Sequence, residues 1–162
     1  MTGAPQYETD FYGWTQDQAA RLRRLPADAY DLDRDNLAEE IEDLGSEKVF
    51  KVSSLLRQTL IHLIKIAAAP EAPAVAHWYD EAITFQGDAV LAFSPGLRQR
   101  IDLDRIWKLA CNGAAASLAV HGDPVPALPK TCPLTLDELL SPDFDPREAV
   151  EKVLIVGNAT RA

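Results

Sequence analysis

The stretch from Asn36 to Ala69 reads NLAEEIEDLGSEKVFKVSSLLRQTLIHLIKIAAA, and it decides the fold. At 100° per residue, its apolar side chains gather on one side of a helix and most charged side chains on the other. The apolar side comprises Leu37, Ile41, Leu44, Val52, Leu55, Leu56, Thr59, Leu63, Ile66 and Ala67. The pattern predicts one long central helix, at about residues 34–69, against which the rest of the chain packs.

Gly45 lies inside this pattern and allows two interpretations. A glycine inside a helix costs about 1 kcal/mol relative to alanine, and a glycine also commonly ends a helix. The first helix could therefore end at Gly45 and a second could begin at Ser46. We favour one continuous helix, because the apolar residues keep the same phase on both sides of Gly45.

The second half of the stretch is apolar on nearly every side, since Ile61 and Ile64 lie behind the main apolar side. A helix of this kind is buried on most of its surface. His62 and Lys65 interrupt the apolar run, which is too short to span a membrane. We therefore expect a buried core helix that ends before Pro70, and no membrane partner.

The rest of the sequence predicts more helices and no sheet, because no segment alternates polar and apolar residues over a strand length. Thr135 with Glu138 forms a capping-box pattern, and Pro146 suits the first position of a helix. The further helices are expected at about 9–24, 74–93, 94–120 with a break near Asp102, a short segment after Thr135, and about 146–156. We predict an all-α, single-domain bundle of five to six helices over residues 1–162.

The composition narrows the possible partners and the compartment. The 162 residues include 25 acidic and 16 basic side chains, which gives a net charge of -9. This charge opposes binding to nucleic acid, so we expect no nucleic-acid partner. Cys111 and Cys132 are the two cysteines, too few for a metal framework, and the first residues do not resemble a signal peptide. We expect a cytoplasmic protein with reduced thiols.

Four residues are the candidates if the protein has a metal site: Glu39, Glu40, Asp43 and His62. Glu39 and Asp43 are four residues apart, so their carboxylates share one face of the helix and could bind a divalent cation. A helical di-iron site, however, uses Glu-x-x-His pairs, and this sequence contains none. We favour a solvated acidic surface at the start of the helix, and we predict no metal and no cofactor.

The sequence contains no catalytic motif: it has no G-x-S-x-G, P-loop, G-x-G-x-x-G or H-E-x-x-H. His62 borders the apolar side and would need a partner such as Cys111, Asp10 or Glu40 to act as a base. Cys111 lies among alanines and glycine, which favours an inert thiol. We therefore assign no catalytic residue.

Phe50 falls among polar residues on the helical projection, near Asp43 and Arg57. Either a neighbouring helix covers it, or it forms part of a partner surface. We give more weight to the first interpretation.

Five segments occur in an order that resembles a known bacterial family. They are DFYGW (10–14), NLAEEIEDLG (36–45), LIHLIK (60–65), SPGL (94–97) and CPLTLDELL (132–140). Together they resemble the family named domain of unknown function 29, over about residues 7–145. The resemblance implies a compact helical domain in a bacterial protein, and it implies no catalytic residues. The Ala-rich segment 114–119 departs from the family pattern, in which charged residues are more usual there, and this favours packing of that face.

These observations favour a non-catalytic interaction or structural domain that forms a homodimer. The expected contact is the small-residue face of residues 110–120 or the face that carries Phe50. The alternative is a metal- or thiol-dependent enzyme that uses the region of Glu39, Glu40, Asp43 and His62.

Overall fold

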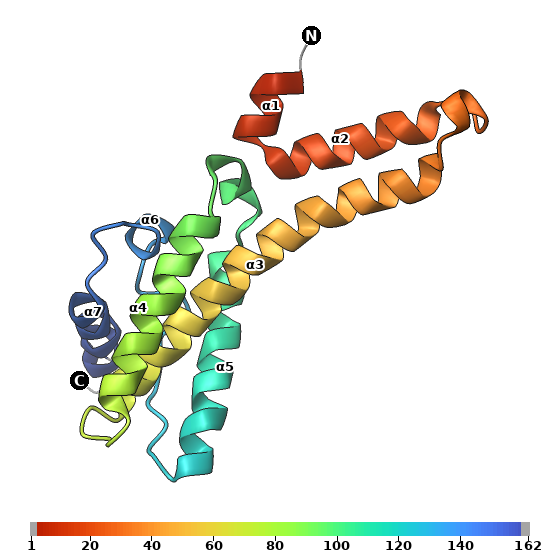
Figure 1. Ribbon diagram of the computed structural model, residues 1–162. Coiled ribbons are helices and arrows are strands. Elements are labelled where there is room, and N and C mark those ends of the chain that lie inside the picture. Colours follow the sequence, from red (N-terminus) through yellow and green to blue (C-terminus); the bar gives the residue numbers. More distant parts are fainter. Residues whose placement is uncertain (1–2, 160–162) are drawn as a thin grey trace. The chain divides into compact units, whose positions relative to one another are not determined.

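The computed structural model describes residues 3–159, and it describes the side chains of residues 6–154. Within that range the chain is helical and has no strand (Figure 1). The elements are α1 (Gly3–Thr9), α2 (Phe11–Arg24), the 3-10 helix η1 (Ala29–Asp31), α3 (Arg34–Ala68), α4 (Val75–Ala92), the 3-10 helix η2 (Pro95–Arg100), α5 (Leu103–His121), α6 (Leu136–Leu139) and α7 (Pro146–Ala159). The all-α prediction is confirmed.

Helix α3 has 35 residues and continues through Gly45 without a break. The predicted central helix at about 34–69 and its continuity are therefore confirmed. Although α3 is long, no helix among the described residues combines the length and apolar character that crossing a membrane requires.

The chain forms two compact units, and the boundary between them falls inside α3. Unit 1 consists of residues 1–52 and 92–101, and unit 2 consists of residues 53–91 and the chain from Asp102 onward. The expectation that residues 1–162 form one domain stays a prediction.

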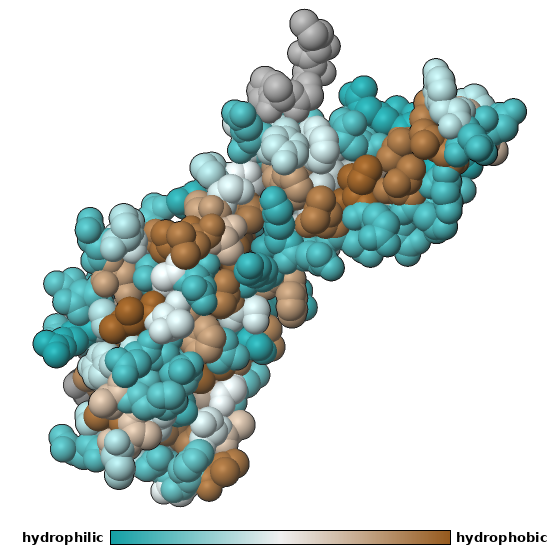
Figure 2. Space-filling model, in the orientation of Figure 1, coloured by the Kyte–Doolittle hydropathy of each residue, from teal (hydrophilic) through white to brown (hydrophobic). Residues whose placement is uncertain are grey.

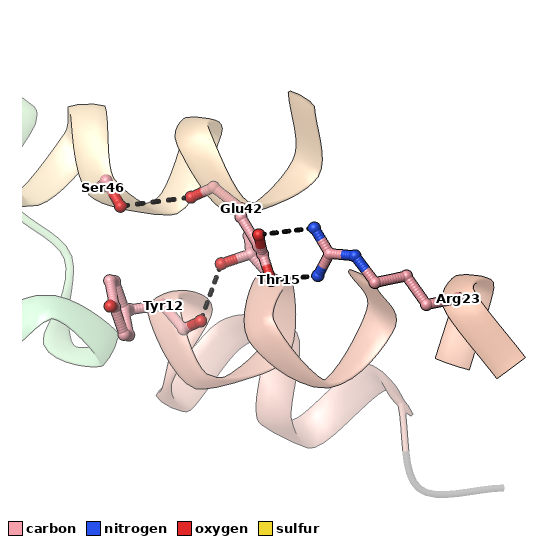
Figure 3. Close-up of polar contacts among 5 residues, drawn as sticks. All are labelled: Tyr12, Thr15, Arg23, Glu42 and Ser46. Carbon is pink, nitrogen blue, oxygen red and sulfur yellow. Dashed lines mark hydrogen bonds and ion pairs between the residues drawn. The ribbon is translucent and has the colours of Figure 1, made fainter. Parts of the chain in front are cut away.

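In unit 1, α2 packs closely against the first half of α3. Asp10 caps α2 by accepting a hydrogen bond from the backbone nitrogen of Gly13, at 3.0 Å. Thr15 of α2 faces α3 (Figure 3) and is fully buried. A Cβ atom added to Gly45 would lie only 2.2 Å from its Oγ1. Gly45 is therefore a point of close helix approach, which explains a glycine inside a continuous helix.

Aromatic residues fill the end of unit 1 where α1, α2 and η2 meet. The rings of Tyr7, Phe11 and Trp14 contact one another with centroid distances from 4.8 to 5.8 Å. The ammonium of Lys48 lies 3.9 Å from the centre of the Phe11 ring. Gly96 of η2 approaches the start of α2 closely, because an added Cβ would lie 2.6 Å from the Phe11 nitrogen.

In unit 2, the second half of α3 contacts both α4 and α5 (Figure 1). The buried side chains of this half of α3 are Leu56, Thr59, Leu60, Leu63, Ile64 and Ile66. This confirms the expectation that the helix is buried on most sides. Gly113 of α5 lets the two helices approach, because its added Cβ would lie 3.0 Å from Cδ1 of Ile61.

Two buried polar side chains fix the connections of unit 2. Gln86 of α4 donates from Nε2 to the carbonyl oxygens of Leu139 and Ser141, at 3.0 and 2.9 Å. Trp107 of α5 donates from Nε1 to the carbonyl oxygen of Pro129, at 2.8 Å. These bonds satisfy the carbonyl groups of Leu139, at the end of α6, and of Ser141 and Pro129, which lie outside the helices.

Candidate functional site

The acidic residues at the start of α3 lie at the surface of unit 1. Glu39, Glu40 and Asp43 are all exposed. Their neighbour Glu42 turns instead toward α2, where it forms a two-point ion pair with Arg23 at 2.5 and 2.9 Å (Figure 3). The hydrogen bond from Arg23 lowers the pKa of Glu42 below its ordinary value. The cluster therefore contributes one carboxylate to helix pairing and presents three to solvent.

The metal candidates do not assemble with other ligand side chains. Within the described residues, no group of three or more histidine, cysteine, aspartate or glutamate side chains could hold a metal ion. Glu39, Glu40 and Asp43 lie in unit 1, whereas His62 lies in unit 2. The structure thus supplies separate carboxylates and a separate imidazole.

His62 lies half-buried on α3 with its ring stacked on Phe85 of α4, at a centroid distance of 5.8 Å and an interplanar angle of 15°. Its Nδ1 atom is buried and has no hydrogen-bond partner among the described residues. Burial lowers the pKa of His62, and the positive charge of Lys65 lowers it further. His62 therefore packs against an aromatic neighbour, and among the described residues its Nδ1 has no partner that could orient the ring as a catalytic base.

The two thiols are poorly suited to nucleophilic chemistry. Cys111 and Cys132 are free and partly buried. Burial raises the pKa of each thiol to about 11, from an ordinary value of 9.0. Because the thiolate is the reactive form, both side chains are almost entirely in the unreactive form near neutral pH.

Unit 2 carries two open grooves. One has a volume of about 680 Å³ and runs along α5 and the segment 128–130, with Trp107, Lys108 and Cys111 in its wall. The other has a volume of about 780 Å³ and lies between α4 and residues 142–147, with Tyr79, Ile83 and Phe144 in its wall. The groove along α5 has one thiol, Cys111, in the same wall as Asp104 and Lys108, and the raised pKa of that thiol keeps it protonated near neutral pH.

Exposed apolar side chains are the unusual feature of the described surface. Phe50 on α3 has 73% of its surface exposed, so the interpretation that a neighbouring helix covers it is wrong. Leu37 and Leu44, which the helical projection placed on the buried side, are 41% and 46% exposed. The sequence pattern missed these two leucines because it shows which side of a helix is apolar, but not what covers that side.

The small-residue face of residues 110–120 is partly used inside unit 2. Ala110, Ala114 and Leu118 are buried, and Gly113 lies against Ile61 of α3. The closeness that these small residues allow therefore serves packing within the chain. Ala116, Ala119 and Val120 of the same segment are exposed, so both of the expected dimer contacts keep exposed residues.

Comparisons with known proteins agree with the helical architecture. The family model described as domain of unknown function DUF29 matches residues 6–145. The chain belongs to this family. The match confirms the resemblance carried by the five sequence segments.

The DUF29 chain is also similar to a solved structure, an alpha-helical protein of unknown function from Rhodospirillum rubrum. The two share 35% sequence identity with a TM-score of 0.78, over 91% of this chain and 96% of the other. No curated protein matches the chain. The likeness supports the helical architecture and names no activity.

Proposed function

We propose that this DUF29 protein is a non-catalytic interaction domain that associates with itself through the face of α3 that carries Phe50. The observation that carries the proposal is the 73% exposure of Phe50 in the middle of a long helix. Fully burying a large apolar side chain stabilises a contact by about 1.5–3 kcal/mol. In a two-fold symmetric contact every residue acts twice, so one exposed aromatic contributes two such gains.

The surroundings of Phe50 are compatible with burial in a contact. Ser46, one turn before Phe50, donates from its hydroxyl to the carbonyl oxygen of Glu42 at 3.3 Å (Figure 3). Because this hydroxyl already has a partner, removing water from it costs little. Asp43 and Glu47 are exposed nearby, and like charges on two copies repel. We therefore expect a weak dimer that salt strengthens by screening this repulsion.

Sedimentation equilibrium over a range of protein concentrations tests the proposal. The wild type should shift from monomer toward dimer, more so at about 0.15 M salt than at lower ionic strength. Phe50→Ser should remain a monomer at the same concentrations. Leu91→Ser is the matched control, because Leu91 is an exposed apolar residue on α4, away from Phe50 in the sequence. This variant should dimerise as the wild type does.

Two results would contradict the proposal. A wild type that stays monomeric at every concentration would rule out self-association. Equal dimerisation of the wild type and Phe50→Ser would place the contact elsewhere. Far-UV circular dichroism of each variant establishes that the helices are intact before the mass is interpreted.

The alternative, a metal- or thiol-dependent enzyme, gains no support from the described side chains. Both thiols have raised pKa values, and His62 stacks on a phenylalanine. Metal analysis of the purified protein tests the metal branch directly. A stoichiometric metal that Glu39→Gln or His62→Ala removes would overturn the non-catalytic assignment.

A further inference from the structure

A second apolar surface lies in unit 1, on the hairpin formed by α2 and the first half of α3. Leu37, Ile41 and Leu44 follow one another at spacings of four and three residues, so they form one stripe along α3. Leu37 and Leu44 are more than two-fifths exposed, and Ile41 between them is half-buried. We call these three residues the hairpin stripe. Figure 2 shows hydrophobic residues gathered in a band along this hairpin, bordered by hydrophilic ones.

The hairpin stripe has a defined end. The next position in the four-three pattern is Lys48, whose ammonium lies 3.9 Å from the centre of the Phe11 ring. The side of α3 next to the stripe faces α2, and Ala38, Gly45 and Val52 on that side are buried. In unit 1, α2 covers one side of this part of α3 and leaves the stripe open. A helix face of this kind, about two turns long, suits the apolar side of one further helix.

Acidic residues border the free edge of the hairpin stripe. On a helical projection Glu40 and Glu47 lie beside Leu44, and Asp43 lies just beyond them. All three carboxylates are exposed. A partner that fills the stripe would therefore place its own flanking residues next to three negative charges, and basic residues there would be attracted.

The tip of the hairpin holds a strained backbone that presents an aromatic ring. Tyr30 and Asp31 have φ values of 60° and 54°, a left-handed conformation that is unfavourable for tyrosine, although aspartate tolerates it. The Tyr30 side chain is 86% exposed, and Leu32 beside it is also exposed. Retained strain of this kind is typical of binding segments, since it fixes a side chain outward before the partner arrives.

We propose that the hairpin stripe binds a basic amphipathic helix of another protein, with Leu37, Ile41 and Leu44 receiving its apolar side and Glu40, Asp43 and Glu47 pairing with its lysines or arginines. A second copy of this chain fits less well, because its own stripe is bordered by the same acidic residues. An anionic membrane or nucleic acid is repelled by the same charges. The inference rests on the proposed role as an interaction domain. Its apolar contact, the hairpin stripe, does not include Phe50, although Asp43 and Glu47 border both surfaces.

Three designed peptides of about five helical turns, roughly 18 residues each, test the chemistry. The first carries leucines at helical spacing with lysines and arginines elsewhere. The second has the same composition with the leucine spacing scrambled. The third keeps the leucine stripe but has glutamates in place of the basic residues. Fluorescence anisotropy measures the binding of each labelled peptide to the full-length protein.

We expect the first peptide to bind and the other two to bind at least about tenfold more weakly, a difference of about 1.4 kcal/mol. The double variant Leu37→Ser and Leu44→Ser should weaken the first peptide by about tenfold or more. Glu40→Lys with Glu47→Lys should weaken it and reduce its dependence on salt. Since these two glutamates are exposed, this second double variant keeps the test valid even if the leucine variant fails to fold.

Leu91→Ser and Phe50→Ser are the controls, and both should bind the first peptide within about twofold of the wild type. Equal binding of the first and scrambled peptides would overturn the inference, because attraction by charge alone would then account for it. Absence of binding, or equal losses in Leu91→Ser, would overturn it as well. Self-association is measured separately through Phe50→Ser, so failure at the stripe and failure of the dimer remain distinguishable.

Discussion

Substitution of the helix glycines by alanine tests how closely α2 approaches α3. Gly45 in α3 and Gly87 in α4 both lie inside helices, so local propensity alone favours alanine at each by about 1 kcal/mol. Their surroundings differ completely. A Cβ added at Gly87 would meet no atom within 4 Å, whereas a Cβ added at Gly45 would lie 2.2 Å from Oγ1 and 3.2 Å from Cβ of Thr15.

The cost at Gly45 follows from the environment of Thr15. Thr15 is fully buried and donates from its hydroxyl to the carbonyl oxygen of Tyr12 at 2.7 Å (Figure 3). A methyl group at residue 45 displaces that hydroxyl, which costs about 1 kcal/mol for the hydrogen bond, and overpacks the contact, which costs about 1–3 kcal/mol. After subtraction of the propensity gain, Gly45→Ala should lower the free energy of unfolding by roughly 1–3 kcal/mol.

Urea denaturation followed by far-UV circular dichroism measures the effect. Gly87→Ala is the matched control and should raise stability by up to about 1 kcal/mol. Gly113→Ala should fall between the two, since its added Cβ meets the flexible end of Ile61 at 3.0 Å. Adding Thr15→Ala to Gly45→Ala should recover part of the loss. Stabilisation by Gly45→Ala would refute the close approach of the two helices.

Three further outcomes follow from buried or paired groups. Gln86→Leu should lower the free energy of unfolding by about 2–4 kcal/mol, because it leaves the carbonyl groups of Leu139 and Ser141 without their donor; urea denaturation checks this. The hydrogen bond from Lys152, followed by those from Thr135, lowers the pKa of Glu138 to about 2 from 4.5. The ionised Glu138 therefore stabilises the fold above about pH 4.5, and this contribution is lost as the pH falls toward 2. Lys152→Met should flatten that part of the pH–stability profile and raise the pKa of Glu138 measured by NMR. Because burial raises the thiol pKa to about 11, the thiolate fraction of Cys111 near neutral pH is about a hundredfold smaller than that of a free thiol of pKa 9.0. Since a thiolate of higher pKa is also more nucleophilic, Cys111 should react with iodoacetamide at least about tenfold more slowly, and unfolding in urea should remove the difference.

Much of the helical architecture could be predicted because helix signals are local. The capping box at Thr135 and Glu138 forms as expected, with both reciprocal hydrogen bonds present. The break near Asp102 is also present, where the Asp102 side chain caps α5 by accepting from the Arg105 nitrogen. Such contacts join residues three apart, so the sequence carries all the information that they require.

The candidate site was harder to predict from the sequence, because it depends on which elements cover which side chains. Phe50 was expected to be covered and is exposed, and no local signal distinguishes those outcomes. The positive φ angles of Tyr30 and Asp31 were also missed. The surrounding run of aspartates, Asp28, Asp31 and Asp33, offered a signal, since aspartate tolerates the left-handed conformation and favours turns.

The contrast between the two halves of α3 shows how one continuous pattern acquires two roles. The same apolar periodicity gives fully buried Leu56, Leu60 and Leu63 in the second half but leaves Leu37 and Leu44 partly exposed in the first. Sequence periodicity reports only that a side of the helix is apolar, whereas burial depends on how many neighbours reach that side. In unit 2 the helix contacts both α4 and α5, while the described contacts of its first half are with α2. The apolar side of α3 therefore extends beyond the part that the chain's own helices cover, and this is a physical reason to look for a partner at the first half of α3.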